Sequence, residues 1–199
     1  MTDFKVSPSD GDLLNKARKG NKGAFEDFYA RYKRRILNYI YRMIGNRESA
    51  EDIAQETFVK AYMNLSTYTE QAKAINWIYT IAGNTCKNFL RDKKLKQQLS
   101  LDAKLLGNEK ISLKDIIQAE GDTPSDLTIN KEQENLVQAH INLMPLKYKE
   151  VLILCDIEGC SYEETAQILR CSVGSVGSRL SRARLILAKK LKKYFKDRG

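Results

Sequence analysis

The stretch Ser161–Leu187, SYEETAQILRCSVGSVGSRLSRARLIL, predicts two short helices that meet at a tight turn. Ser161 is followed three residues later by Glu164, the spacing of a capping box, in which each side chain satisfies a free backbone N–H of the first turn. Ser172 is placed to cap a second helix that starts at Val173. This pattern is typical of a helix-turn-helix, whose second helix enters the major groove of DNA.

Apolar residues of the second helix recur at steps of three and four, so we expect them to share one buried stripe. They are Val173, Val176, Leu180, Ala183, Leu187 and Leu191. The polar side chains point away from the stripe, and four are candidates for DNA contacts: Ser175, Ser178, Arg179 and Arg182. An ordinary helical hairpin with a solvated basic face has the same local pattern, so this segment alone leaves both interpretations open.

The composition of the 199-residue chain fits a folded, helix-rich protein of one or two domains. Hydrophobic residues make up 42% and charged residues 30%, with only 3 prolines. The longest apolar run, Val151 to Cys155, is far too short to cross a bilayer. The first 13 residues lack the apolar core of a signal peptide. We therefore expect a cytoplasmic protein.

The net charge of +9 is unevenly distributed along the chain. Residues 1–100 have 18 Lys and Arg against 11 Asp and Glu, residues 101–135 have 4 against 8, and residues 136–199 have 12 against 6. Two basic blocks thus flank an acidic middle. Basic blocks favour a polyanionic partner, and nucleic acid fits better than a membrane because the basic faces coincide with helix-turn-helix patterning.

Neither a metal site nor a catalytic site is expected. The four cysteines (Cys86, Cys155, Cys160 and Cys171) and the single histidine, His140, do not have zinc-ligand spacing. We expect the cysteines to be buried, reduced thiols. The sequence has no glycine-rich phosphate loop and no nucleophile paired with a base, so no cofactor and no small-molecule substrate are expected.

The periodicity predicts an all-α fold of two small helical domains. The expected helices of the first domain are 12–19, 23–44, 49–65 and 74–95, and Ser49 and Asp52 are placed like a capping pair for the third. Residues 97–131 lose clear periodicity and contain most of the acidic excess. A connection of that length indicates a flexible linker between domains at 1–96 and 132–199. In the second domain, helices are expected over 131–142 and 146–156, ahead of the helix-turn-helix.

A second polar face lies on the predicted helix 74–95. Its amide, hydroxyl and cationic side chains are Thr80, Asn84, Lys87, Asn88 and Arg91. Amides can read base edges and cations can hold phosphates, while Trp77 and Tyr79 offer rings on which unstacked bases could stack. The competing interpretation is a solvated surface helix with Trp77 in the core.

Three segments, taken in order, resemble the extracytoplasmic-function (ECF, group 4) sigma factors of the sigma-70 family, bacterial RNA polymerase subunits that select promoters. GNRESAEDIAQETFVKAY (45–62) is similar to the core-binding signature of region 2, and NWIYTIAGNTCKNFLR (76–91) to its promoter-melting, minus-ten-reading segment. LMPLKYKEVLILCDIEGCSYEETAQILRCSVGSVGSRLSRAR (143–184) is similar to region 4. The resemblance implies a protein without a catalytic site that binds core polymerase and promoter DNA and is restrained by an anti-sigma factor.

The resemblance also implies roles for individual residues. Those that would dock on polymerase are Asp52, Gln55, Glu56 and Phe58. Asn84 would read a base flipped out of the non-template strand, helped by the loop 68–74. Trp77, Thr80, Lys87, Asn88 and Arg91 would complete the minus-ten reader, and Ser175, Ser178, Arg179 and Arg182 would form the minus-thirty-five reader.

Two positions of the predicted reading helix depart from the family pattern. Gly177 stands where a basic residue is common, and Ser181 where a bulky residue is common. These departures leave the preferred bases of the upstream element open. The alternative function is that of a stand-alone helix-turn-helix repressor or activator, which would act on operator DNA as a dimer, without polymerase.

Overall fold

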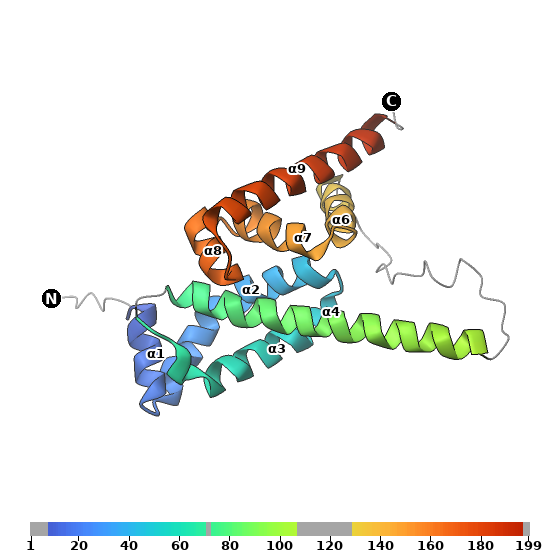
Figure 1. The fold of residues 1–199 in the computed structure, drawn as a ribbon. Helices are drawn as coiled ribbons and strands as arrows, with labels where there is room; N and C mark the ends of the chain where they lie inside the picture. Colours follow the sequence, from blue (N-terminus) through green and yellow to red (C-terminus); the bar gives the residue numbers. More distant parts are fainter. Residues whose placement is uncertain (1–7, 71–72, 107–128, 197–199) are drawn as a thin grey trace.

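The computed structural model describes residues 8–70, 73–106 and 129–196, and all the regular elements in these ranges are helices (Figure 1). The N-terminal domain consists of α1 (Asp10–Arg18), α2 (Lys22–Ile44), α3 (Arg47–Met63), a 3₁₀ turn (Leu65–Thr67) and α4 (Ala74–Leu106). The C-terminal domain consists of α6 (Ile129–Asn142), α7 (Leu146–Leu152), a π-helical turn (Ile153–Ile157), α8 (Tyr162–Leu169) and α9 (Val173–Lys196). The predicted all-α class is confirmed.

The core of the N-terminal domain lies where α2 is enclosed by α1, α3 and α4. Phe28, Ile36 and Ile40 of α2 are fully buried there, and Ile78 of α4 meets them from the other side. These residues recur at helical spacing, which places them on one face of each helix. These apolar faces therefore determine how α2 and α4 pack.

The start of α3 differs from its prediction. The helix begins at Arg47, and the side chain of Asn46 caps it by accepting a hydrogen bond from the Ser49 N–H at 2.8 Å. The predicted capping pair of Ser49 and Asp52 is therefore wrong. The cause is Gly45, which ends α2 with a left-handed backbone (φ 77°) and leaves Asn46 extended in the N-cap position.

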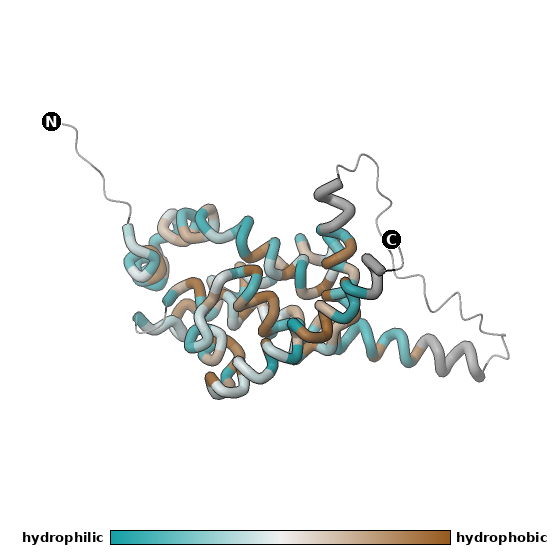
Figure 2. Tube along the Cα trace, turned by 90° about the horizontal axis from the view of Figure 1, so that it is seen from above, coloured by the Kyte–Doolittle hydropathy of each residue, from teal (hydrophilic) through white to brown (hydrophobic). Residues whose placement is uncertain are grey.

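Helix α4 is longer than predicted and continues from Leu95 to Leu106. It projects beyond the rest of the N-terminal domain (Figure 1), and the coloured portion of the projection is mainly hydrophilic (Figure 2). The first ten residues of the expected linker, 97–106, are thus helical, and residues 107–128 lie outside the described residues. No helix in the described ranges is both long enough and apolar enough to span a membrane.

The C-terminal domain packs α8 and α9 on a buried apolar segment around α7. Val151 to Leu154 form the floor, and Ile168, Val176, Leu180 and Ala183 cover them. The expected apolar stripe of α9 is therefore largely present. It is wrong for Val173, which is 43% exposed, because the first turn of α9 extends past the core.

The two domains pack against each other through polar as well as apolar groups. Helix α8 lies on α4, and α6 lies against α2. The buried ammonium of Lys149 donates hydrogen bonds to the backbone carbonyls of Met43 and Asn142, each at 3.2 Å. Burial lowers the pKa of Lys149. The sequence predicted two domains, and the structure shows that their described parts pack against each other.

Substitution of the observed cap tests the start of α3. Asn46→Ala removes the acceptor of the Ser49 N–H and is expected to lower the free energy of unfolding by about 1 kcal/mol. The matched control is Ser49→Ala, which leaves the Asn46 cap in place and should change the stability by less than about half as much. Urea denaturation followed by circular dichroism measures both. A larger loss for Ser49→Ala than for Asn46→Ala would contradict the observed cap.

Candidate nucleic-acid interface

The helix-turn-helix is built as the sequence predicted. The Ser161 side chain accepts from the Glu164 N–H at 3.1 Å, and the Glu164 carboxylate accepts from the Ser161 N–H at 2.8 Å. Arg170 ends α8 with a left-handed backbone (φ 51°). The Ser172 hydroxyl then accepts from the Ser175 N–H at 3.2 Å and caps α9. Both helices therefore begin at the predicted serines.

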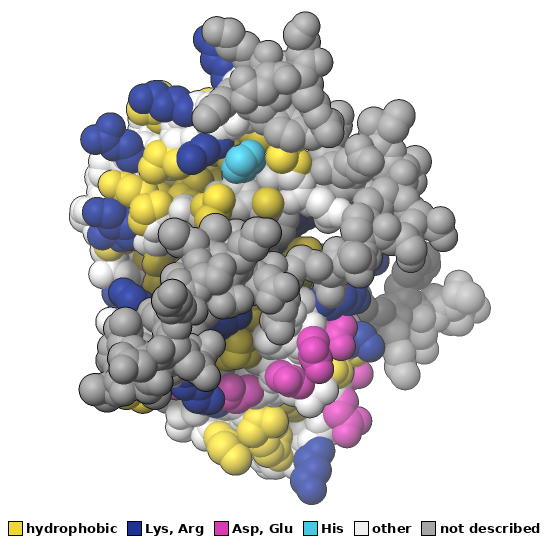
Figure 3. All heavy atoms as spheres, turned by 90° about the vertical axis from the view of Figure 1, so that its right-hand side faces the viewer, with side chains coloured by type: hydrophobic (Ala, Val, Ile, Leu, Met, Phe, Trp, Pro, Cys, Tyr) yellow, Lys and Arg dark blue, Asp and Glu magenta, His cyan; other side chains and the backbone are white. Residues whose placement is uncertain are grey.

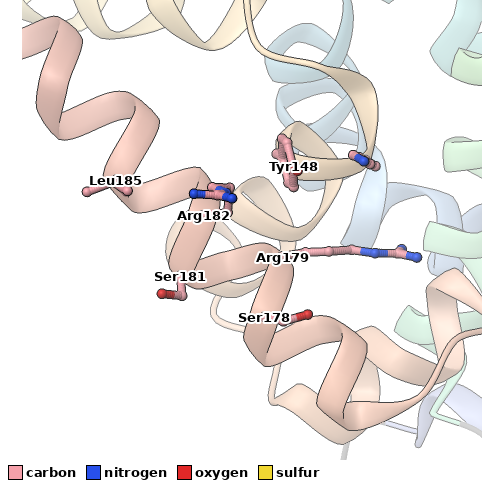
Figure 4. A pocket seen from close by; sticks show the side chains of 7 residues that line it. Tyr148, Ser178, Arg179, Ser181, Arg182 and Leu185 are labelled. Carbon is pink, nitrogen blue, oxygen red and sulfur yellow. The ribbon is translucent and has the colours of Figure 1, made fainter.

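The polar face of α9 borders a hollow between α9 and the start of α7 (Figure 4). Ser178, Arg179 and Arg182 line it, as the prediction for the reading helix requires. No carboxylate pairs with Arg179 or Arg182 within the described residues. Their guanidinium groups are therefore available for phosphates or base edges. Ser175 lies apart, half-buried, with its hydroxyl 2.9 Å from that of Ser172.

Sequence reasoning missed two residues of this hollow. Lys147 and Tyr148, at the start of α7, line it opposite the reading helix. The Lys147 ammonium lies 5.0 Å from the centre of the Tyr148 ring. A cation and an aromatic hydroxyl are groups that contact DNA backbone, but they stand about 30 residues before the reader. No spacing rule brings them together, and only the packing of α7 on α9 does so.

Two other residues of α9, Arg184 and Gly177, do not line this hollow. Arg184 donates to the Asp156 carboxylate from two guanidinium nitrogens, Nη2 at 2.6 Å and Nε at 2.9 Å, so it fastens α9 to the end of the π-helical turn. Gly177 faces α8, because a methyl group at that position would lie 3.6 Å from the Tyr162 ring. The absence of a side chain at Gly177 therefore affects how α9 packs on α8. Ser181, by contrast, lines the hollow.

The predicted minus-ten face on α4 is partly exposed and partly engaged. Asn84, Asn88 and Arg91 are exposed. The Thr80 hydroxyl donates to the Asn76 carbonyl at 2.9 Å, and the Lys87 ammonium lies 2.7 Å from the Glu150 carboxylate of the C-terminal domain. Of the five polar residues, Lys87 is therefore paired with a carboxylate of the other domain while its side chain stays 36% exposed.

The two aromatic residues expected to offer stacking rings lie in different surroundings. Trp77 is half-buried, its indole N–H donates to the Thr67 hydroxyl at 3.1 Å, and its ring meets Tyr68 edge-on at 5.6 Å. It therefore supports the loop before α4, and its contact with DNA stays a prediction. Tyr79 is fully buried against Tyr39, so the expectation that it offers an exposed ring is wrong.

The predicted polymerase-docking residues occupy two sides of α3. Gln55 and Phe58 line a hollow with Tyr29 and Leu37 of α2. Phe58 is 5% exposed and forms the floor of the hollow, with its ring edge-on to Tyr29 at 4.8 Å. Its walls on α2, Tyr29 and Leu37, were not among the predicted docking residues.

Glu56, on the other side of α3, lies 2.6 Å from Lys60 and lines a second hollow with Asn88. Asp52, like Gln55 and Glu56, is exposed. Asp and Glu side chains gather on the N-terminal domain in the side view, beside a hydrophobic patch (Figure 3). The exposed apolar residues of α3 are Val59, Tyr62 and Met63. Acidic groups beside apolar surface suit a protein partner better than a nucleic acid.

The cysteines are less uniformly buried than expected. Cys86 and Cys160 are buried, Cys155 and Cys171 are half-buried, and all four thiols are free. Burial raises the pKa of Cys86 to about 12 and that of Cys160 to about 11. These two thiols are therefore protonated at neutral pH and pack as small apolar groups.

Fold and surface together define a two-domain helical protein that presents a helix-turn-helix reader on one domain and an amide-bearing helix on the other. Comparison with known families agrees: residues 28–96 match the model of sigma-70 region 2, and residues 134–187 match that of sigma-70 region 4. The chain belongs to the extracytoplasmic-function sigma factors.

Two relatives support the assignment over at least 90% of the chain. The ECF RNA polymerase sigma factor SigW of Bacillus subtilis is 37% identical over 179 residues, which are 90% of this chain and 95% of that protein. The RNA polymerase sigma-H factor of Pseudomonas aeruginosa is 32% identical over 94% of this chain and 96% of its own.

Solved structures share the fold. CnrH in complex with the cytosolic domain of CnrY gives a TM-score of 0.68 at 21% identity, over 94% of this chain and 99% of that one. The sigma factor RpoE of Bartonella quintana, bound to the anti-sigma factor NepR, gives 0.64 at 23% identity, over 84% and 96%.

The position of Gly177 leads to a stability prediction. Gly177→Ala is expected to raise the free energy of unfolding by about 1 kcal/mol, because alanine is the better helix former and its methyl group meets Tyr162 at an ordinary contact distance. Gly159→Ala is the control of opposite sign, since Gly159 has φ of 71°. Thermal denaturation compares the two. Destabilisation by Gly177→Ala would show that the helix needs glycine there.

Proposed function

We propose that this sigma factor binds core RNA polymerase through α3 and directs promoter-specific initiation by reading two DNA elements. The observation that carries the proposal is the exposure of two separate readers. Asn84 and Asn88 stand on α4, while Arg179 and Arg182 stand on α9 without carboxylate partners in the described part of the chain. The amides of the first set can donate to and accept from base edges, and the guanidinium groups of the second can donate to base edges and phosphates.

Two readers on one chain answer a physical problem. A good base contact contributes about 1–3 kcal/mol, and phosphate contacts weaken as salt is added, so a short helix-turn-helix alone selects DNA poorly. When both readers are held on one polymerase surface, the second contact becomes intramolecular and gains a high effective concentration. Selectivity then requires both elements at the right separation.

The minus-ten reader would capture a flipped base of the non-template strand. Asn84 has a free amide on the exposed side of α4, and the loop before α4 is braced by the contact of Trp77 with Tyr68. Flipping costs a few kcal/mol, which polymerase contacts and strand capture would offset. Asn88 and Arg91, one and two turns further on, would hold the neighbouring backbone or bases.

The minus-thirty-five reader would place α9 in the major groove. Arg179 and Arg182 would contact bases or phosphates, and Ser178 would add a hydroxyl. Lys147 and Tyr148, across the hollow, would contact the sugar-phosphate backbone beside the groove. Such a protein acts in the cytoplasm and is restrained by an anti-sigma factor. The RpoE structure, solved with the anti-sigma factor NepR, is a precedent for such a partner.

Reconstituted transcription tests the proposal as a whole. Adding the protein to bacterial core polymerase is expected to start RNA synthesis at defined promoters, which core polymerase alone does not use. The alternative, a stand-alone repressor or activator, predicts tight, sequence-specific binding by the free protein and no effect on core polymerase. That second result would overturn the proposal.

Asn84→Ala tests the minus-ten reader. The variant is expected to lower opening of a matched promoter at least about tenfold, because the flipped base loses its amide partner, while affinity for core polymerase stays unchanged. The control is Asn38→Ala, an exposed asparagine of α2, which should leave both unchanged. Permanganate footprinting measures opening. Loss of core binding by Asn84→Ala would move this residue off the DNA face.

Arg179→Ala tests the upstream reader. Loss of the guanidinium is expected to weaken binding of the holoenzyme to its upstream element about tenfold and to relax the preference at one base pair. Tyr148→Phe removes a backbone contact only, so it should weaken binding to all upstream sequences alike. Competition with a set of single-base promoter variants measures both. An unchanged base preference in Arg179→Ala would exclude this residue from base reading.

A further inference from the structure

The polar face of α9 carries one large apolar side chain, that of Leu185. This side chain is 47% exposed, and it lines the hollow together with Ser178, Ser181 and Arg182. Figure 4 shows Ser181 and Leu185 on one side of α9, while Arg179 points the opposite way. The leucine is therefore part of the surface that would face DNA, although no prediction from the sequence assigned it a contact.

Leu185 completes the spacing by which a helix in the major groove reads bases. Positions i, i+3, i+4 and i+7 of this face are occupied by Ser178, Ser181, Arg182 and Leu185. At 3.6 residues per turn, the four side chains fall within an arc of about 100°. The recognition helix of a homeodomain contacts the major groove from four residues with the same spacing. The fourth position of the pattern is therefore placed to contact a base.

The neighbour one turn before Leu185 leaves this leucine accessible. A long side chain on a helix leans over the turn that precedes its own Cα, so Leu185 leans towards position 181. Ser181 has a small side chain and is itself exposed. A bulky residue at that position would pack against the leucine and cover it. With serine there, the apolar surface of Leu185 is free to meet a ligand.

The chemistry of the major groove determines which base suits a leucine. All four bases present hydrogen-bond donors or acceptors there, and thymine adds a methyl group at C5. A leucine side chain has no hydrogen-bonding group, so the thymine methyl is the complementary feature. Contact between the two removes apolar surface from water on both sides and is therefore favourable.

From these observations we propose that Leu185 belongs to the upstream reader and contacts the methyl group of a thymine in the minus-thirty-five element. The inference rests on the proposed function and deepens it, because it names one base that the reader selects. The contact distinguishes thymine from the other three bases without a hydrogen bond. It also gives a role to the small side chain of Ser181, which keeps the leucine uncovered.

An exposed leucine can also bind a protein, so a polymerase surface is the competing partner. The surroundings of Leu185 favour DNA. Among the described residues that line the hollow, there are three cations, Lys147, Arg179 and Arg182, and no carboxylate. A concave surface with this charge attracts a polyanion. The leucine thus lies within a surface that is suited to nucleic acid.

Uracil in place of thymine tests the contact, because uracil lacks only the methyl group and pairs with adenine in the same way. The probe is a fluorescein-labelled promoter duplex, taken from the reconstituted transcription, whose upstream element contains either thymine or uracil. The holoenzyme is formed with the full-length wild type, with Leu185→Ala or with Leu185→Met. The matched control is Leu143→Ala, which truncates a leucine that is 77% exposed and lies outside the hollow. Fluorescence anisotropy measures the affinities, and thermal denaturation checks that the variants are folded.

We expect the wild type and Leu143→Ala to bind the uracil duplex about fourfold more weakly than the thymine duplex, the effect of one buried methyl group. Leu185→Ala should bind both duplexes alike, while Leu185→Met, which keeps an apolar side chain, should retain most of the difference. Equal affinity of the wild type for the two duplexes overturns the proposal. So does a methyl effect that persists in Leu185→Ala. A loss of affinity for core polymerase in Leu185→Ala would also overturn it, because the leucine would then face polymerase.

Failure of the proposed function can be told apart from failure of this inference. If the free protein bound one DNA site selectively and had no effect on core polymerase, the proposed function would be refuted. The same comparison of thymine and uracil at that site would then still judge Leu185. A protein that selected no DNA site, with or without polymerase, would refute both.

Discussion

The packing of the two domains on each other includes one buried carboxylate, that of Glu158, which lies between Arg35 and Tyr79 of the other domain. A charge taken out of water is costly unless it is paired and hydrogen-bonded, and here both conditions are met only while the domains are in contact. This contact therefore favours the closed arrangement, in which the two domains touch.

This constraint connects the fold to the function. The buried apolar residues of the two domains form one continuous cluster, to which Met43 of α2 and Ile141 of α6 both belong, so apolar contacts also hold the domains together. The α3 surface proposed to dock on polymerase and the α9 surface proposed to read DNA both remain uncovered.

Much of this could be predicted from the sequence, because local patterns determine it. The caps at Ser161 and Ser172, the helical class and the exposed polar residues of α4 and α9 follow from propensity and periodicity. The cap at Asn46 was missed because Ser49, three residues later, also has the spacing of a capping residue and was assigned that role. The contacts of Lys147 and Tyr148 with the reading helix, and of Arg35 with Glu158, could not be predicted, because they join residues about 30 to 123 positions apart. Such contacts depend on tertiary packing, for which a single sequence has no periodic signal.

The most direct measurement is a double-mutant cycle between Arg35 and Glu158 in the isolated protein. The substitutions Arg35→Gln and Glu158→Gln would be studied singly and together, with the free energy of unfolding measured in urea at low salt. A coupling energy of at least about 0.5 kcal/mol, reduced at high salt, is the result that the closed arrangement predicts. Additive effects at every salt concentration would mean that the two side chains do not meet in solution and would contradict the account.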